Sequence, residues 1–384
     1  MKIAILTTSS TTGGAAIVTA RLADALQALG HEVRLFTLEG KRERKPAFLM
    51  ERLGIFMRNG LNRKNLFKGS MADFGQHGLV KTVEEWVPDA VVMGWINQGL
   101  LSLRQIDRLA TMGKPIAWIM HDMWCFTGFC HHSLGCMRYT DRCGRCPLLS
   151  SRGPKDLSYK GWRRKRKAYG LAPNLKFVAV SRWLQSMAAR SSLLRDRDVA
   201  MVPNVFPIER FAIGGKEPGL IAMGAERLDD PIKGLHHAVD ALNKLDPALG
   251  AHVAFFGNIQ DRSALEKLRV PYELVGMLTP QGVADLLGRA QVVLSSSLYE
   301  TLPTTLIEGQ ASGAVPVSYD RGGQADIVDH LRSGYLAPFG DSDALSRGIA
   351  WAMEGRITPE SLRAEVERKF GAEAVAHQLL ELLK

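Results

Sequence analysis

The 384-residue sequence lacks an uninterrupted apolar run long enough to span a membrane. Its first twelve residues carry one lysine and only a four-residue apolar stretch, residues 3–6, which is unlike a secretory signal. We therefore expect a cytoplasmic protein. The sequence also lacks internal repeats and low-complexity segments, since its 37 glycines and 17 prolines follow no period. With 46% hydrophobic and 23% charged residues, the composition excludes a disordered or fibrous chain.

Cysteine is scarce, and all five cysteines lie between residues 125 and 146. Four of them form a C-x5-C-x6-C-x2-C cluster, made of Cys130, Cys136, Cys143 and Cys146. In a reducing compartment this clustering favours a structural tetrathiolate zinc site. Paired disulfides and unligated packing thiols are the alternatives, and His131 or His132 could replace a cysteine ligand.

Acidic residues are scarce in the first half of the chain. Residues 1–205 carry 32 lysines and arginines against 15 aspartates and glutamates, a net charge of +17. Residues 206–384 carry 17 against 24, a net charge of −7. Most of the basic excess comes from residues 41–68 and 152–167. This density predicts an anionic partner for the first half, with solvated loops as the alternative.

The first basic run contains apolar residues at helical spacing beside its cations: Leu49, Leu53, Phe56, Met57 and Leu61. This pattern indicates an interfacial helix. We expect it to dock on anionic lipid at the inner face of the cytoplasmic membrane and to receive a polyprenyl-diphosphate-linked acceptor. The alternative is an ordinary core-facing helix with one solvated side.

Length and hydrophobic periodicity predict two α/β domains, because the chain is too long for a single core at about 150 residues per domain. The opening is typical of a βαβ unit: a buried strand, a turn at Gly13 and Gly14, a helix closed by Gly30, and a second strand. Buried strands are expected at residues 90–93, 116–119, 177–180 and 199–202. A second series of predicted strands begins after Asn204, at residues 220–223, 253–256, 273–275, 292–295 and 315–317.

We expect a Rossmann-like N-terminal domain over residues 1–205 with a cysteine-rich insertion at 125–147, and a Rossmann-like C-terminal domain over 206–360. Residues 361–384 should form a helical crossover that packs back on the first domain. Parallel sheets bind ligands at the carboxyl ends of their strands. The working site is therefore expected in a cleft between the two domains.

Two carboxylates follow the strand at residues 292–295. Glu300 lies in the loop after it, and Glu308 lies eight positions later in a predicted helix. Pro303 stands just before this helix, so the first N–H groups, those of Thr304 and Thr305, suit a diphosphate. A solvated helix position is the alternative for Glu308.

Two cations follow the strand at residues 220–223. Arg227 comes after the strand and Lys233 opens the next helix, which again favours phosphate at a strand end. A surface ion pair with Asp229 or Asp230 is the alternative for Arg227.

With these residues the sequence resembles the retaining GT-B glycosyltransferases of family 4, and within them the exopolysaccharide enzymes of the colanic-acid type. The resemblance covers nearly the whole chain. It rests on the GGAA turn, PDAVVMGWINQG, the HDMWCFTGFCHHSLGC and CGRCP block, the arginine and lysine pair, and the E-x7-E stretch. It implies an α/β fold with two Rossmann-like domains, a nucleotide-diphospho-sugar donor, and a lipid-linked or oligosaccharide acceptor.

The resemblance also implies a role for each site residue. Arg227 and Lys233 would neutralise the diphosphate, Glu308 would bind the ribose, and Glu300 would contact the donor sugar. His121 would reach the sugar from the opposite domain. Glycines would allow close approach of the donor or contact its base: Gly13, Gly14, Gly276, Gly322 and Gly323.

The sequence departs from the family pattern at Thr301, Leu302 and Pro303, where relatives have a Gly-Phe-Gly-like loop, and at Gly309, where alanine is usual. A cationic, helix-capped pocket stabilises the charge on the leaving group, so no catalytic metal is expected. The family's retention of anomeric configuration implies front-face attack, with a donor phosphate oxygen accepting the acceptor's proton.

Other function classes explain parts of the sequence. A nucleic-acid-binding zinc protein would account for the charge and the cysteines but not for Glu300 and Glu308, so we expect no nucleic acid partner. The remaining alternatives are an epimerase, a transferase with a soluble acceptor, and a non-catalytic scaffold of a polysaccharide assembly complex.

Overall fold

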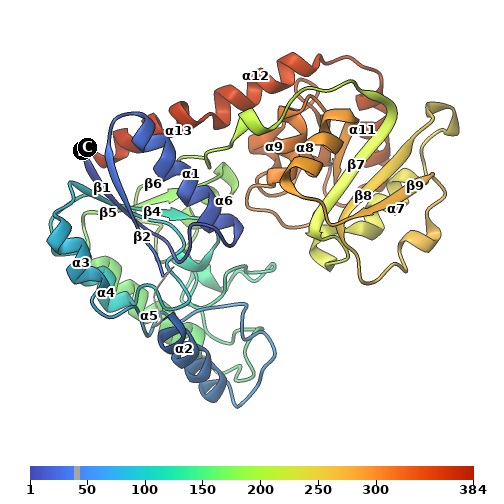
Figure 1. Ribbon diagram of the computed structural model, residues 1–384. Coiled ribbons are helices and arrows are strands. Elements are labelled where there is room, and N and C mark those ends of the chain that lie inside the picture. The colour runs from blue at the N-terminus through green and yellow to red at the C-terminus, as the bar shows by residue number, and fades with distance from the viewer. Residues whose placement is uncertain (39–43) are drawn as a thin grey trace. The chain divides into compact units, whose positions relative to one another are not determined.

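The computed structural model describes residues 1–38 and 44–384. The chain forms two compact units, of which the first comprises Met1–Val205 and Ala372–Lys384 and the second Phe206–Gly371. Each unit is built on one parallel sheet of six strands (Figure 1). Lys41 and Arg42 of the first basic run lie outside the described residues.

The sheet of the first unit has the strand order β2-β1-β3-β4-β5-β6. Its strands are β1 (Lys2–Leu6), β2 (Glu32–Phe36), β3 (Ala90–Met93), β4 (Ile116–Met120), β5 (Leu175–Ala179) and β6 (Val199–Met201). Every residue of β3 and β4 is buried. Central strands of a parallel sheet are covered on both faces, and the continuous apolar runs of these two strands meet that requirement.

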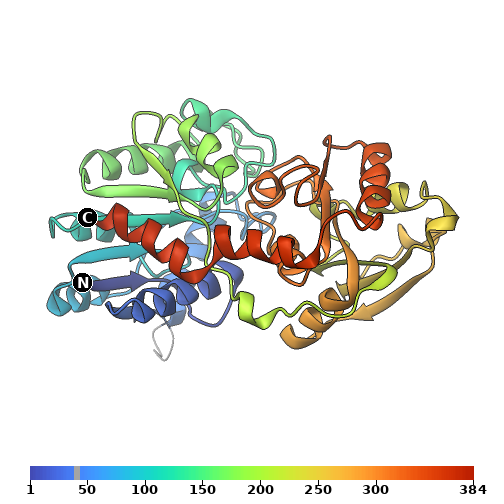
Figure 2. The ribbon, with the colours of Figure 1, turned by 90° about the horizontal axis from the view of Figure 1, so that it is seen from above.

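The helices of the first unit are α1 (Gly14–Ala28), α2 (Arg44–Arg58), α3 (Leu79–Trp86), α4 (Leu103–Ala110), α5 (Leu157–Gly170), α6 (Arg182–Ala189) and α13 (Ala372–Leu383). Ser102 begins α4 in a capping box with Gln105, and Asp156 caps α5. Helix α13 lies along the first unit (Figure 2), where it packs on α1 and its Leu382 carbonyl accepts from Lys176 Nζ at 2.6 Å.

The sheet of the second unit has the order β12-β11-β10-β7-β8-β9. Its strands are β7 (Glu217–Arg227), β8 (His252–Asn258), β9 (Tyr272–Gly276), β10 (Ala290–Ser295), β11 (Val315–Tyr319) and β12 (Tyr335–Ala337). The chain passes from β7 to β9 on one side and continues with β10 on the other side of β7. The strand order therefore reverses between β7 and β10, which is where open α/β sheets bind ligands.

The helices of the second unit are α7 (Leu235–Leu242), α8 (Pro280–Arg289), α9 (Thr304–Ala311), α10 (Gln324–Ile327), α11 (Ser342–Met353) and α12 (Pro359–Phe370). The unit extends to Gly371 and so includes α12, beyond the boundary at residue 360 expected from the sequence. Its two ends lie together, since the Phe206 N–H donates to the Phe370 carbonyl at 3.0 Å.

The predicted fold class is confirmed: the chain is α/β, with two parallel sheets and a last helix packed on the first unit. Each strand expected from an apolar run is present, and β12, with no strong apolar pattern, is the added one. No helix within residues 1–38 and 44–384 combines the length and the apolar character needed to cross a bilayer. The cleft between the domains stays a prediction.

Candidate active site

A cavity opens at the carboxyl edge of the second sheet, at the ends of β7, β8 and β9. Strand β7 ends at Arg227, and Glu300 follows the neighbouring strand β10. The cavity has a volume of about 520 Å³ and is lined by Glu226, Arg227, Asp230, Lys233, Asn258 and Met277. Two of the predicted phosphate ligands therefore share one cavity.

Lys233 is held at this cavity by a short turn. A 3-10 turn capped by Asp230 ends at Lys233. The next residue, Gly234, has a φ of +64°, and a Cβ atom there would lie 2.4 Å from the Ser296 carbonyl oxygen. Only glycine permits this approach of the two backbones. The Lys233 ammonium lies 2.5 Å from Glu300 Oε1, so the structure joins these two predicted residues directly.

Arg227 is held more loosely than Lys233. Its side chain is 56% exposed, and its guanidinium lies 3.4 Å from the Asp229 carboxylate. Burial alone would raise the pKa of Asp229, but hydrogen bonds from Arg227 and from the Asp261 N–H bring it below the ordinary value. The surface ion pair left open by the sequence is present, and the same guanidinium lines the cavity beside Lys233.

Two glycines support the loop that carries Glu300. Gly322 has a φ of +79°, and a Cβ atom there would lie 2.2 Å from the Glu300 carbonyl oxygen. A Cβ atom on Gly323 would lie 2.0 Å from the Thr301 carbonyl oxygen, and the Gly323 N–H donates to the Glu300 carbonyl at 3.0 Å. Both glycines therefore pack on the backbone of the Glu300 loop.

Helix α9 begins directly after the Glu300 loop. Pro303 is its N-cap, so Thr304 and Thr305 stand in the first turn, where N–H groups have no acceptor within the helix. Glu308 is half-buried on the same helix. Gly309 packs closely on β10, because a Cβ atom there would lie 2.3 Å from a valine side chain of that strand. This contact explains glycine at a position where alanine is usual.

The structure brings some of the predicted donor residues together and leaves others apart. Arg227 and Lys233 line one cavity, and Glu300 contacts Lys233. Gly276 ends β9 and precedes Met277, which lines the same cavity. Three predicted residues of α9 are not among the lining residues: Thr304, Thr305 and Glu308.

In the first unit His121 comes directly after β4. Its Nε2 lies 3.3 Å from the Thr19 hydroxyl of α1. Burial lowers the pKa of His121 to about 4, although the neighbouring Asp122 opposes this shift. The imidazole is therefore neutral near pH 7 and can exchange hydrogen bonds without carrying charge.

A buried Asp–His pair beside His121 was not predicted as part of the site. Asp122 Oδ2 lies 2.7 Å from His131 Nδ1, and Oδ1 accepts from the Trp124 N–H at 2.7 Å. Burial alone would raise the pKa of Asp122, but His131 brings it below the ordinary value. Trp95, which follows β3, stacks on the His131 ring with centroids 5.0 Å apart. The available sequence signal was the His-Asp dipeptide followed nine residues later by a second histidine.

Gly13 and Gly14 open α1 next to the carboxyl end of β1. Gly13 is the N-cap and has a φ of +89°, which favours glycine. A Cβ atom at either position would meet nothing within 4 Å. The helix N-terminus therefore has open space above it, and its role in donor binding stays a prediction.

The four cysteines predicted to bind zinc line one small cavity of about 20 Å³: Cys130, Cys136, Cys143 and Cys146. None of them is in a disulfide, which sets aside the disulfide alternative. Burial raises the pKa of Cys130 and of Cys143 to about 12. Across the described part of the chain, no three or more His, Cys, Asp or Glu side chains are arranged to hold a metal ion. Zinc ligation therefore stays a prediction.

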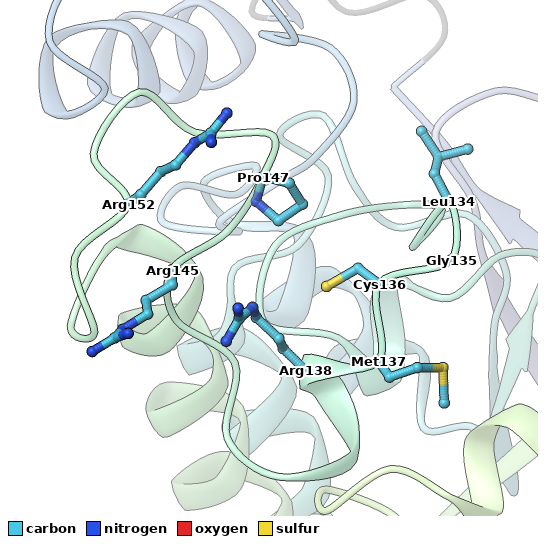
Figure 3. Close-up of a pocket in the computed structure, with 8 residues that line it drawn as sticks. All are labelled: Leu134, Gly135, Cys136, Met137, Arg138, Arg145, Pro147 and Arg152. Atoms are coloured by element: carbon cyan, nitrogen blue, oxygen red, sulfur yellow. The ribbon is translucent and has the colours of Figure 1, made fainter.

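A larger cavity of about 780 Å³ lies over the cysteine-rich insertion (Figure 3). It is lined by Leu134, Gly135, Cys136, Met137, Arg138, Arg145, Pro147 and Arg152. The guanidinium of Arg138 turns toward Cys136, whereas Arg145 and Arg152 extend away from it. Arg138 and Arg145 lie outside the two basic runs, and Arg152 is the first residue of the second run. The charge count along the sequence therefore gave no signal for this cavity.

Family models match both units. The model described as Glycosyltransferase Family 4 matches residues 12–210, and the model described as Glycosyl transferases group 1 matches residues 206–369. The chain belongs to glycosyltransferase family 4. The family predicted from the sequence motifs is thereby confirmed.

Two curated relatives of this family 4 chain align over part of their length. The amylovoran biosynthesis glycosyltransferase AmsK of Erwinia amylovora is 32% identical over 122 residues, which is 29% of this chain and 30% of AmsK. The putative colanic acid biosynthesis glycosyltransferase WcaL of Salmonella typhimurium is 30% identical over 192 residues, which is 44% of this chain and 46% of WcaL. This chain thus matches less than half the length of either relative.

Solved structures share the fold over the whole chain. The Anabaena protein Alr3699/HepE in complex with UDP superposes with a TM-score of 0.63 at 17% identity, covering 100% of this chain and 99% of that one. A glycosyltransferase from Rickettsia africae gives 0.66 at 15% identity, covering 100% and 97%. The lipopolysaccharide outer core galactosyltransferase WaaB gives 0.64 at 16% identity, covering 100% and 99%. These likenesses establish the GT-B fold of this family 4 chain.

Proposed function

We propose that this chain is a retaining hexosyltransferase that moves a sugar from a nucleotide-diphospho-sugar to a hydroxyl of a lipid-linked glycan. The observation that carries the proposal is the placement of Arg227, Lys233 and Glu300 at the switch point of the second sheet. Two cations beside one cavity suit a diphosphate, and an adjacent carboxylate suits sugar hydroxyls.

Donor binding would change the partner of Lys233. Its ammonium now has a carboxylate partner, Glu300, at 2.5 Å. A diphosphate carries more negative charge and more acceptor oxygens than a carboxylate, so it would take over Lys233 and free Glu300 for the sugar. The first N–H groups of α9 would add donors to the phosphates, and Glu308 on the same helix would bind the ribose hydroxyls.

Transfer would break the bond between the anomeric carbon and the diphosphate oxygen and form a bond from that carbon to the acceptor oxygen. The charge that grows on the leaving diphosphate would be stabilised by Lys233 and Arg227, which supply the electrostatic role without a catalytic metal. A donor phosphate oxygen would take the acceptor's proton. Attack from the face of the leaving group keeps the anomeric configuration.

Neutral His121 would orient the sugar by a hydrogen bond. The contact of Nε2 with the Thr19 hydroxyl at 3.3 Å holds one edge of the ring, and the low pKa keeps the imidazole uncharged. An uncharged imidazole would not compete with Lys233 and Arg227 for the diphosphate.

The names of the relatives suggest the pathway. Two are named for amylovoran and colanic acid biosynthesis, and one solved structure is a lipopolysaccharide outer core galactosyltransferase. We infer that this chain works in the assembly of a cell-surface polysaccharide.

A thermal-shift panel of GDP-, UDP- and ADP-sugars tests donor binding, because a ligand of the native state raises its melting temperature. One nucleotide class should raise the melting temperature of the wild type and not that of Lys233→Ala. Lys244→Ala is the matched control, since Lys244 is an exposed lysine of the same unit that pairs with Asp343 at 2.8 Å. A wild type that responds to no nucleotide sugar contradicts the proposal. Transfer of sugar to any acceptor eliminates a non-catalytic scaffold.

We also propose that Cys130, Cys136, Cys143 and Cys146 hold one structural zinc ion. Their sharing of one small cavity supports this. The Gly128 N–H donates to Cys143 Sγ at 3.2 Å, a contact that favours a thiolate. A zinc ion at this place would be held by the four thiolates in a tetrahedral arrangement.

Buried Lys165 supports an anionic cluster at this place. Its ammonium lies 3.4 Å above the Trp124 ring and donates to the Thr127 carbonyl at 2.9 Å. Between described residues it forms no ion pair, and burial lowers the pKa of Lys165 to about 7. A zinc tetrathiolate, with a net charge of about −2, would favour its charged form.

Metal analysis of the purified chain should then give about one zinc per chain. Cobalt-substituted protein should show thiolate-to-cobalt absorption, which Cys143→Ser should weaken. Cys125→Ala should keep the metal, because Cys125 is buried but does not line the cavity. A metal-free chain with four alkylatable thiols would show that the cysteines only pack.

A further inference from the structure

A further cavity, of about 530 Å³, opens on the first unit where three segments far apart in the sequence meet. We call it the α5 cavity. It is lined from the cysteine-rich insertion by Asp141 and Arg142, from α5 by Tyr159, Trp162 and Arg166, and from the connection between α6 and β6 by Asp196. It shares no residue with the cavity of Arg227 and Lys233, which belongs to the second unit.

The α5 wall of this cavity is aromatic. Tyr159, Trp162 and Arg166 are spaced by three and four residues, so they lie on one side of the helix. The Tyr159 and Trp162 rings stack with centroids 5.8 Å apart, and the Arg166 guanidinium lies over the Trp162 ring at 5.4 Å. Trp162 is consequently only 6% exposed. Tyr159 and Arg166 are more exposed, so they are the flat groups that a ligand can reach.

Hydrogen bonds join the three segments that form the cavity. Trp162 Nε1 donates to the Ser192 hydroxyl at 2.9 Å, which links α5 to the connection after α6. The Ser192 N–H donates to the Tyr139 carbonyl at 3.2 Å, and Arg195 donates to the Thr140 carbonyl. Both of these contacts link that connection to the insertion. A ligand therefore meets walls that are already held in place, which lowers the entropy cost of binding.

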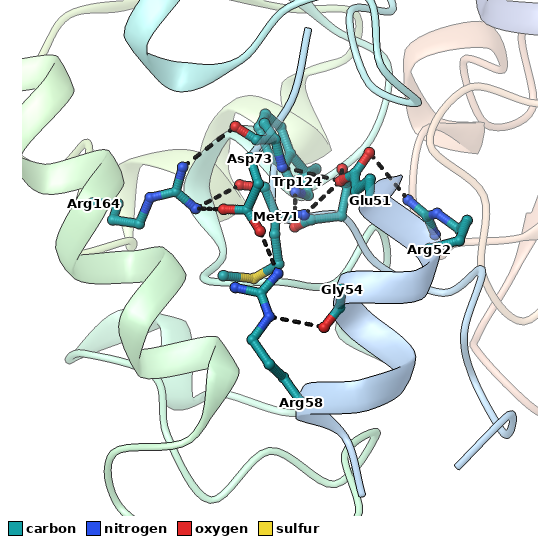
Figure 4. A network of polar contacts seen from close by, with 10 residues as sticks. Glu51, Arg52, Gly54, Arg58, Met71, Asp73, Trp124 and Arg164 are labelled. Atoms are coloured by element: carbon teal, nitrogen blue, oxygen red, sulfur yellow. Dashed lines mark hydrogen bonds and ion pairs between the residues drawn. The ribbon is translucent and has the colours of Figure 1, made fainter. Parts of the chain in front are cut away.

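The other side of α5 is anchored inside the unit. Arg164 donates to the Met71 carbonyl at 3.0 Å and pairs with Asp73 (Figure 4). Lys165 is buried and donates to the Thr127 carbonyl at 2.9 Å. These two cations of the second basic run thus hold α5 in the unit. The helix cannot turn its aromatic side away from the cavity without breaking these contacts.

The charged groups of the α5 cavity have both signs. Three arginines, at positions 142, 166 and 195, line it together with two aspartates, at 141 and 196. Arg166 and Asp196 form no ion pair with any residue in the described part of the chain, so both are available to a ligand. The two carboxylates oppose a phosphate or a polyanion, because like charges in contact are unfavourable. The lining also has no aliphatic side chain that would suit an apolar peptide.

A sugar chain matches this combination of groups. The C–H bonds of a sugar ring form an apolar face that stacks on a flat aromatic or guanidinium group. Each sugar hydroxyl both donates and accepts, so neighbouring hydroxyls can bond a carboxylate or a guanidinium through two atoms. An aromatic wall with both arginines and aspartates therefore suits uncharged sugar better than it suits an ion.

We propose that the α5 cavity binds a neutral segment of a glycan chain, with residues other than those of the transfer site. This inference goes beyond the proposed function, which requires a donor site and one acceptor hydroxyl. An enzyme with such a second site keeps hold of a long glycan from one transfer to the next. Long acceptors should therefore have a lower KM than short ones.

Titration of the full chain with neutral hexasaccharides of glucose, of galactose and of mannose tests the proposal, with saturation-transfer NMR as the readout. At least one should bind the wild type without nucleotide sugar, with a Kd of about 1 mM or tighter. Tyr159→Ala removes the stacking surface and should weaken this binding about ten-fold. Asp196→Asn, on an exposed connection, should weaken it about five-fold.

Arg166→Ala and Arg163→Ala form a matched pair, because both arginines are exposed on α5 but only Arg166 lines the cavity. The first should weaken hexasaccharide binding and the second should not. Asp196→Asn should keep the wild-type melting temperature, which separates a loss of binding from a loss of folding. A wild type that binds no hexasaccharide, unchanged binding in Tyr159→Ala and Asp196→Asn, or an equal loss in Arg163→Ala would each overturn the proposal.

Two further measurements separate the possible failures. Heparin is a polyanion, and binding of heparin in preference to every hexasaccharide, lost at high salt, would show plain attraction to the arginines and overturn the proposal. The nucleotide-sugar thermal shift should be the same in Tyr159→Ala as in the wild type. A chain that binds a hexasaccharide but no nucleotide sugar would fail the proposed function alone, and the converse would fail the α5 cavity alone.

Discussion

The two units share a six-stranded parallel sheet but use their charged residues differently. In the second unit, Arg227 and Lys233 line an open cavity, and each has one carboxylate partner. In the first unit, Glu51 and Lys165 are buried and hydrogen-bonded to backbone groups. Charge near an open cavity is available to a ligand, whereas charge buried among backbone donors and acceptors fixes the chain around it.

The strand orders add to this difference. The first sheet reverses between β1 and β3, and the second reverses between β7 and β10. In the second unit both cations come from the end of β7 and the turn after it, so a short stretch of chain makes the proposed phosphate site. In the first unit the groups near His121 come from α1, the β3 loop and the insertion after β4, which must be held together by buried contacts.

The variant Glu51→Ala tests whether a buried charge stabilises the chain around it. It removes the acceptor of three hydrogen bonds and leaves the buried Arg52 side chain without its carboxylate, 3.5 Å away. We expect the free energy of unfolding to fall by about 3–5 kcal/mol. Urea denaturation measures this. Glu84→Ala, which breaks the more exposed pair with Arg108, should cost about 1 kcal/mol or less, and equal losses would contradict a special role for Glu51.

The variant Lys233→Ala tests whether a charge at the open cavity binds a ligand. Turnover should fall by about two to three powers of ten, because a main stabiliser of the leaving diphosphate is lost. The free energy of unfolding should change little, since the Lys233 side chain is partly exposed. Steady-state kinetics with the donor found in the thermal-shift panel measures the effect. Near-normal turnover in Lys233→Ala, or an equal loss in Lys244→Ala, would refute the assigned role.

The low pKa of His121 predicts acid sensitivity of the first unit. The folded imidazole resists protonation until about pH 4, whereas the unfolded one takes up a proton near its ordinary value of 6.5. The unfolded state therefore binds more protons in this range, and stability falls as the pH falls from 6.5 to 4, by up to about 3 kcal/mol. Unfolding curves of the wild type and His121→Gln measure it. A difference between them that does not vary with pH would contradict the prediction.

Gly322→Ala should have a modest effect on folding and a specific effect on donor binding. Gly322 and Gly340 have almost the same φ, +79° and +80°, but a Cβ atom at 322 meets the Glu300 carbonyl whereas one at 340 meets nothing within 4 Å. Both alanine variants should lose about 1 kcal/mol from the positive φ. Only Gly322→Ala should also weaken the nucleotide-sugar thermal shift. The same weakening in Gly340→Ala would show that the Glu300 loop is not the cause.

Much of the fold followed from the sequence because the buried strands are continuous apolar runs. The run at residues 90–93 coincides with β3, and the run at 116–119 lies within β4. Strand β7 continues to Arg227, beyond the predicted end at 223, through residues with little apolar character. It is extended there by pairing with β8 and has a register shift near Arg227. That pairing depends on the neighbouring strand, so local sequence carries no signal for it.

The candidate site was predictable where neighbours in sequence are neighbours in space. Arg227 and Lys233 are six residues apart and share a cavity, and the helix after Pro303 begins where expected. The contact of Lys233 with Glu300 spans 67 residues and depends on β7 and β10 lying side by side. The Asp122–His131 pair depends on how the insertion folds back, and spacing alone does not specify that path.

The hydrogen bond from the Phe206 N–H to the Phe370 carbonyl has a consequence for protein engineering. Because the two ends of the second unit touch, residues 206–371 form a cassette that enters and leaves the surrounding chain at one point. Such a cassette is suited to excision, to independent expression, and to replacement by the equivalent segment of another family member with a different sugar specificity. A chimaera made at these two junctions would exchange the second unit while leaving the first unit and its last helix intact.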